Sequence, residues 1–159
     1  MATRDEKRDA VIRTHQNRMD AERKRKADAA AGQEERAKKL REDRQIWAAN
    51  AIPTIGAGAG ASADAFARRG SPYVILSGPD VSPDSVTYKV CPSGRPSHIE
   101  ASFTFELRDG YVYPESTARG CDKFPGAVLV GDVTRDWVED VADSVMTAVL
   151  GGHQMSIPD

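Results

Sequence analysis

The sequence predicts an α+β protein: a long charged N-terminal helix, then an antiparallel sheet of four or five strands that a C-terminal amphipathic helix covers on one face. Three observations support this prediction. Charged helix-forming residues fill the first 50 positions, apolar and polar residues alternate from 98 to 108, and an apolar stripe at helical spacing runs from 137 to 150. Along the chain we expect a charged helical arm at 1–50, a Gly/Ala-rich joint with a short helix at 51–70, an α+β body at 71–152 and a tail at 153–159.

Charge separates the arm from the rest of the chain. Residues 1–45 carry 14 Lys/Arg and 10 Asp/Glu, no aromatic residue and one glycine, Gly32, where the helix could hinge. The arm is therefore net positive and the remainder net negative, although the whole chain has a net charge of −2 and a pI near 5.9. This balance gives no overall attraction to nucleic acid or to a membrane. One interpretation of the arm is a solvated helix whose last turns, Leu40 to Trp47, dock on the body.

A second interpretation makes the arm a partner-binding element. Every seventh residue lies near one side of a helix, and these positions hold Ile12, Met19, Lys26, Gln33, Leu40 and Trp47. Four of the six are apolar, which is typical of one seam of a coiled coil. The second seam is mostly polar, so pairing with a second copy should be weak. We therefore expect a non-enzymatic interaction or adaptor module whose arm engages a protein partner, or weakly a second copy, through Ile12, Met19, Leu40 and Trp47.

An alternative function rests on the four consecutive cations Arg23, Lys24, Arg25 and Lys26. Such a cluster could contact phosphates, which would make the chain a nucleic-acid-associated protein. Acidic residues flank the cluster on both sides, and no aromatic residue interleaves it. We therefore place a protein partner first and nucleic acid second.

Residues 56–61 alternate glycine and alanine and allow two interpretations. Gly56, Gly58 and Ala61 occupy the places of a dinucleotide-binding turn between a strand and a helix. The strand that this would need contains Pro53, and the next apolar run is not followed by the expected acid. The structural interpretation is a helix with Pro53 near its first turn, which the glycines weaken so that it forms only from Ser62 onward.

The body contains alternating apolar segments typical of strands. The clearest places Ile99, Phe103 and Leu107 on one face, and Asp109-Gly110 then predicts a two-residue hairpin turn. This turn pairs Leu107 with Val112 and leaves Tyr111 and Tyr113 on the outer face. We expect strands at 73–76, 85–91, 98–108, 111–113 and 127–130.

The C-terminal helix has the most complete set of signals. Thr134 is a natural N-cap, and the apolar stripe that begins at Trp137 predicts a helix laid across the sheet. We expect Gly151-Gly152 to end this helix. Trp137 is therefore predicted to anchor the core.

Weak chemical candidates lie in the body. Cys91 and His98 flank one loop, and both are expected to point away from the core with Glu100, as a thiol–imidazole pair would require. Cys121 could add a third zinc ligand, but the spacing matches no known zinc motif. The segment Pro114–Gly126 has no periodic pattern and could be a functional loop. We predict no catalytic residue, no cofactor and no metal site, so that enzyme activity, either nucleotide-dependent or thiol-based, is the last of the alternatives.

Three features that the sequence lacks bear on where in the cell the protein is expected. The first 30 residues contain no apolar stretch typical of a secretory signal, and no segment has enough consecutive apolar residues to cross a membrane. The two cysteines are too few for a disulfide framework. We therefore expect a soluble cytoplasmic protein with no membrane partner.

Overall fold

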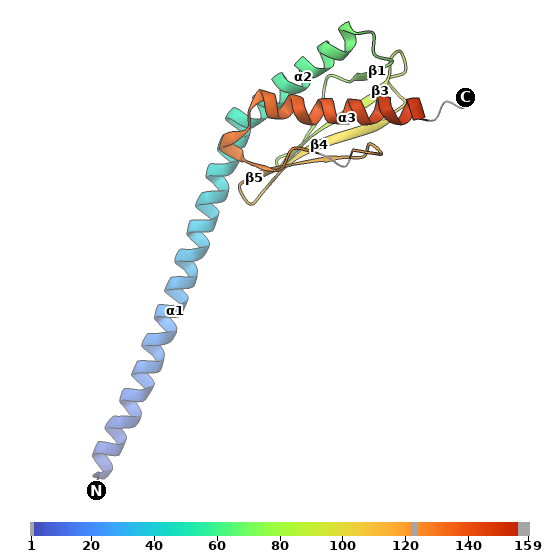
Figure 1. The fold of residues 1–159 in the computed structure, drawn as a ribbon. Coiled ribbons are helices and arrows are strands. Elements are labelled where there is room, and N and C mark those ends of the chain that lie inside the picture. The colour runs from blue at the N-terminus through green and yellow to red at the C-terminus, as the bar shows by residue number, and fades with distance from the viewer. Residues whose placement is uncertain (1, 122–123, 156–159) are drawn as a thin grey trace. The chain divides into compact units, whose positions relative to one another are not determined.

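The computed structural model describes residues 2–121 and 124–155 and has a mixed α+β architecture (Figure 1). The chain forms two compact units, Met1–Arg41 and Glu42–Asp159. The helices are α1 (Arg4–Ile46), a π-helix (Trp47–Ala51), α2 (Ile52–Arg68), a 3-10 helix (Val130–Asp132) and α3 (Arg135–Met155). The strands are β1 (Tyr73–Ile75), β2 (Asp80–Val81), β3 (Ser85–Pro92), β4 (Ala101–Arg108), β5 (Tyr111–Ser116) and β6 (Val128–Leu129).

Local side-chain interactions begin and support α1. Thr3 and Glu6 form a capping box, in which each side chain accepts a hydrogen bond from the backbone N–H of the other, at 3.2 and 2.9 Å. The helix then continues through Gly32 without a break. Acids precede bases by four residues at five places, each of which stabilises a helix by about 0.2–0.5 kcal/mol. These pairs are Asp9–Arg13, Asp20–Lys24, Glu22–Lys26, Glu34–Lys38 and Glu35–Lys39.

The π-helix ends two residues before Pro53 and joins α1 to α2. Proline lacks an N–H, and its ring crowds the carbonyl four residues earlier, so a helix that continues through proline must widen or kink. Here the N–H of Ile52 reaches back five residues to the carbonyl of Trp47. The helix therefore continues through Pro53, and α2 begins at Ile52 rather than at Ser62 as the sequence suggested.

The Gly/Ala segment lies inside α2, so the strand–turn–helix required for a dinucleotide turn is absent from the described residues 52–68. Gly58 is buried where α2 meets α3: a Cβ added at position 58 would lie 2.6 Å from the Cβ of Val138. One turn later, the buried Ser62 donates a hydrogen bond to the Asp143 carboxylate at 2.6 Å. Small residues here allow two helix backbones to approach closely, which is a structural role.

The sheet is antiparallel, with strand order β1-β3-β4-β5-β6 and β2 paired beside β3. The predicted hairpin is confirmed: Leu107 pairs with Val112, and Asp109 and Gly110 both have positive φ, at 50° and 81°. The start of the predicted strand at His98 is wrong, because β4 begins at Ala101 and Ile99 is 50% exposed. The strand β2 was not predicted, because two residues are too few to show an alternation of apolar and polar side chains.

One core joins the helices of the second unit to one face of the sheet, as Figure 1 shows for α3. Thr134 caps α3 by accepting a hydrogen bond from the N–H of Trp137 at 3.2 Å, and Trp137 is buried, both as predicted. The predicted end at Gly151-Gly152 is wrong, since α3 continues to Met155. Gly151 does not have the left-handed φ that a glycine stop requires, and glycine costs a helix only about 1 kcal/mol otherwise.

Candidate interaction surface

The first unit is a helix with all its side chains open to solvent. Of its described residues, 2–41, none is buried, and only Glu22 and Gly32 are half-buried. Helices in proteins gain most of their stability by burying one face against other elements. Within its own unit α1 has no such contact, so its surface is available to another molecule.

The bulky apolar side chains of the first unit are exposed. Val11, Ile12, Met19 and Leu40 have exposed fractions of 70, 56, 38 and 48%. Ile12, Met19 and Leu40 were predicted as partner-binding residues, and the structure leaves them accessible. Trp47 was predicted with them, but the structure corrects this: Trp47 is 1% exposed and belongs to the core of the second unit. It therefore cannot contact a partner from the arm.

Charge is distributed unequally around α1. Successive residues of an α-helix are about 100° apart, so side chains within one arc of about 140° share a face of residues 4–41, the part of α1 that belongs to the first unit. We call the arc that contains the four bulky apolar residues the basic–apolar face. It holds Arg4, Lys7, Arg8, Val11, Ile12, His15, Arg18, Met19, Glu22, Arg25, Lys26, Ala29, Ala30, Gln33, Arg36, Ala37 and Leu40.

The predicted basic cluster does not form a patch on one side. Arg23, Lys24, Arg25 and Lys26 are all exposed, but four successive residues point in four directions around a helix. Arg25 and Lys26 lie on the basic–apolar face, whereas Arg23 and Lys24 lie outside it. A flat ligand can therefore meet only part of this cluster at a time.

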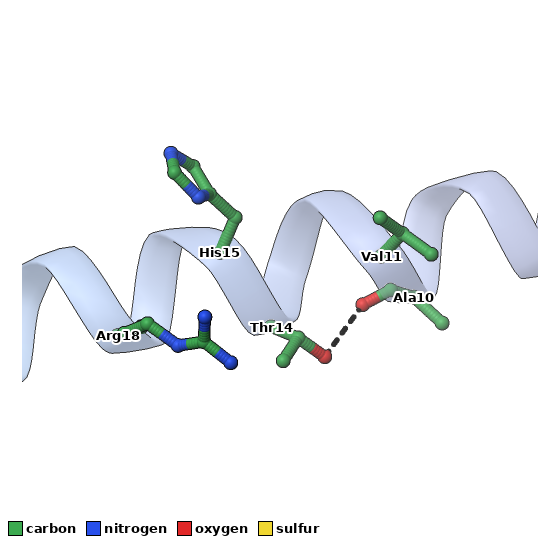
Figure 2. Close-up of a pocket in the computed structure, with 5 residues that line it drawn as sticks. All are labelled: Ala10, Val11, Thr14, His15 and Arg18. Carbon is green, nitrogen blue, oxygen red and sulfur yellow. Dashed lines mark hydrogen bonds between the residues drawn. The ribbon is translucent and has the colours of Figure 1, made fainter.

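Figure 2 shows part of the surface of α1, formed by Ala10, Val11, Thr14, His15 and Arg18. The Thr14 hydroxyl donates a hydrogen bond to the carbonyl of Ala10 at 2.9 Å, and Val11 and His15 project from the same side of the ribbon. All five residues come from one helix, so the surface has no opposite wall. Small-molecule sites are usually concave and enclose their ligand, which this surface cannot do.

The thiol–imidazole pair is not assembled. Cys91 lies on the face of β3 opposite the core residue Val90, as predicted, but it is only 1% exposed. His98 is 63% exposed and lies 3.5 Å from Glu100. No group of three metal-ligating side chains occurs among the residues that the structure describes, and these include Cys91, His98 and Cys121. The predicted loop 114–126 is corrected at its start, because β5 extends to Ser116. Within that segment Asp122 and Lys123 lie outside the described residues, as do 156–159 of the predicted tail.

Polar side chains on the outer face of the sheet contact one another. The hydroxyls of Thr87 and Thr104 are 2.8 Å apart across β3 and β4. Arg108 lies 3.5 Å from both Glu106 and Glu115, with its guanidinium 4.3 Å from the centre of the Tyr113 ring. A phosphate or carboxylate ligand would have to displace these contacts, which disfavours this face as an anion site.

The edge of β5 beyond its pairing with β6 does not favour the addition of another strand. By the register of β4 and β5, Pro114 occupies a position whose N–H would face away from β4. Proline has no N–H to offer there, and such a residue discourages strand addition. This edge is therefore not the best candidate for peptide binding.

Comparison with known proteins finds no match to this chain among protein-family models, curated proteins or solved structures. In the part of the chain that the structure describes, no helix combines the length and the apolar character needed to cross a membrane.

Proposed function

We propose that this protein is a non-enzymatic interaction module in which α1 engages a protein partner through Ile12, Met19 and Leu40. The observation that carries the proposal is the exposure of these side chains on a helix whose unit buries none of its described residues. The second unit supplies a stable body with its own core.

A second copy is the weaker candidate for the partner. Two parallel copies that met in register along the same seam would bring Lys26 close to its counterpart, and Arg23 likewise. Like charges in a coiled-coil core oppose pairing and are tolerated only at a cost in stability. The apolar positions between them are too few to offset this along the whole helix. A different protein avoids the repulsion because it need not repeat these cations.

The test compares partner capture by the full chain with capture by a variant that carries Ile12→Ser, Met19→Ser and Leu40→Ser. Proteins from the source cell that are retained by the wild-type chain are quantified, and we expect the variant to lose those that bind through α1. Exposed side chains contribute little to folding, so the variant should keep its helix content and its unfolding midpoint.

The matched control carries Ala21→Ser, Ala27→Ser and Ala31→Ser, which are exposed on α1 but outside the basic–apolar face. It should retain the same proteins as the wild type. Capture that is unchanged by the apolar substitutions, or lost equally in the control, would contradict the proposal. Light scattering of the full chain would show whether a second copy binds instead.

A further inference from the structure

We infer that the partner of α1 is an acidic protein surface, which binds the basic–apolar face through its carboxylates and through apolar pockets. This inference rests on the proposed function and adds the chemistry of the partner. The partner is expected to contact the basic–apolar face and to carry negative charge.

The charge count on this face carries the inference. The face contains seven Lys/Arg and a single carboxylate, that of Glu22. The cations are Arg4, Lys7, Arg8, Arg18, Arg25, Lys26 and Arg36. They extend over about 48 Å of helix at a rise of 1.5 Å per residue. A partner that covers this length would therefore meet positive charge throughout.

The remaining surface of α1 between residues 4 and 41 is close to neutral. It carries six Lys/Arg and seven Asp/Glu, so almost every carboxylate of the helix lies away from the basic–apolar face. The acid–base pairs four residues apart that support the helix mostly involve these side chains, such as Asp9–Arg13 and Asp20–Lys24. Of the cations on the basic–apolar face, Arg8 forms an ion pair with Asp5 at 3.3 Å, and Lys26 lies four residues after Glu22. The other five have no acid four residues before them, and all seven are exposed.

The apolar residues on the same face favour a protein over a phosphate ligand. Ile12, Met19 and Leu40 gain free energy only if they leave water, and a row of phosphates offers them no apolar contact. A lipid surface is also a poor match. Interfacial helices place bulky apolar residues opposite their Lys/Arg, whereas here both share one face and no aromatic residue is present. An acidic protein groove can satisfy both kinds of side chain at once.

The experiment measures binding of the full-length chain to a synthetic amphipathic helix that presents Leu and Glu on one face. The variant Arg25→Glu/Arg36→Glu reverses two cations on the basic–apolar face. We expect it to bind at least about tenfold more weakly at low salt, because each exposed charge pair contributes about 0.2–1 kcal/mol and reversal also adds repulsion. Binding of the wild type should weaken as salt is raised.

The matched control is Arg13→Glu/Lys24→Glu. In each variant the two substituted positions are eleven residues apart, and the two variants change the net charge equally. Arg13 and Lys24, however, lie outside the basic–apolar face. The control also breaks two favourable acid–base pairs in the helix, so general damage to α1 would affect it more than the test variant. We expect its affinity to change by less than about threefold. Circular dichroism checks the helix content of both.

The same peptide with Lys in place of Glu provides a rescue: Arg25→Glu/Arg36→Glu should bind it better than the wild type does. Equal losses in the two variants, no rescue, or no binding to the acidic peptide would overturn the inference. Tighter binding to duplex DNA or to phosphatidylserine vesicles than to the peptide would overturn it as well. In all these cases, capture that depends on Ile12, Met19 and Leu40 would still support the proposed function.

Discussion

Gly58 of α2 lies against Val138 of α3 so closely that a Cβ at position 58 would sit 2.6 Å from the Val138 Cβ and 3.0 Å from the Arg135 carbonyl oxygen. Real Cβ atoms essentially never approach other heavy atoms to 2.6 Å, so α2 and α3 could not keep this spacing with a larger residue. The contact gives a packing reason for the glycine at position 58 of α2.

The first prediction concerns this contact. Gly58→Ala should lower the free energy of unfolding by about 1–2 kcal/mol, because overpacking costs about 1–3 kcal/mol and outweighs the gain of up to about 1 kcal/mol in helix propensity. Urea denaturation followed by tryptophan fluorescence would measure it. The control is Gly60→Ala, where a Cβ would meet no atom within 4 Å. It should be neutral or stabilising, and equal effects at the two positions would contradict the packing argument.

The second prediction concerns the hydrogen bond beside this contact. Ser62 is 1% exposed and donates to Asp143 at 2.6 Å. Ser62→Ala should lower the free energy of unfolding by about 1–2 kcal/mol, since a hydrogen bond to a charged group is lost. Ser144→Ala is the control, because the Ser144 hydroxyl donates only within its own helix, to the backbone carbonyl of Asp140, in a hydrogen bond that is exposed. A loss at Ser144 as large as that at Ser62 would argue against a special role for this bond.

The third prediction concerns Trp47. Its ring is 1% exposed, and its Nε1 has no hydrogen-bond acceptor within the described ranges, so ring packing accounts for its contribution. Trp47→Ala should cost about 3–5 kcal/mol of unfolding free energy. Leu40→Ala, at an exposed position of α1, should change it by less than about 0.5 kcal/mol. Thermal unfolding would distinguish the two, and a mild effect of Trp47→Ala would show that Trp47 lies outside the core.

The fourth prediction concerns alkaline pH. Burial raises the pKa of Tyr88 above its ordinary value of 10.0. Above that pH the unfolded chain releases the phenolic proton while the folded chain retains it, so the free energy of unfolding should fall as pH rises from 10 toward the folded pKa. Tyr88→Phe should flatten this part of the curve. Stability measured across this range in both proteins would decide, and identical slopes would contradict the assignment.

Much of the fold follows from local patterns. The alternation in 101–108 and the Asp109-Gly110 turn predict β4, β5 and their register, because strand periodicity and positive φ are properties of neighbouring residues. Thr134 and the stripe from Trp137 predict α3 for the same reason. The candidate surface was partly predictable too: Ile12, Met19 and Leu40 emerge from heptad spacing. The separation of cations from carboxylates around α1 was missed, although a helical projection would have found it.

Periodicity, capping and charge act within a few residues, so the sequence alone predicts most of the helices and strands and a charged helical arm that precedes a body with a core. The folded structure was needed to choose between the two interpretations of Trp47, which belongs to the core of the body, and to show that Gly58 and Ser62 serve helix packing. It also decided that Cys91 is buried. These outcomes depend on which surfaces meet across long stretches of chain, such as α2 against α3, and local sequence carries no signal for that.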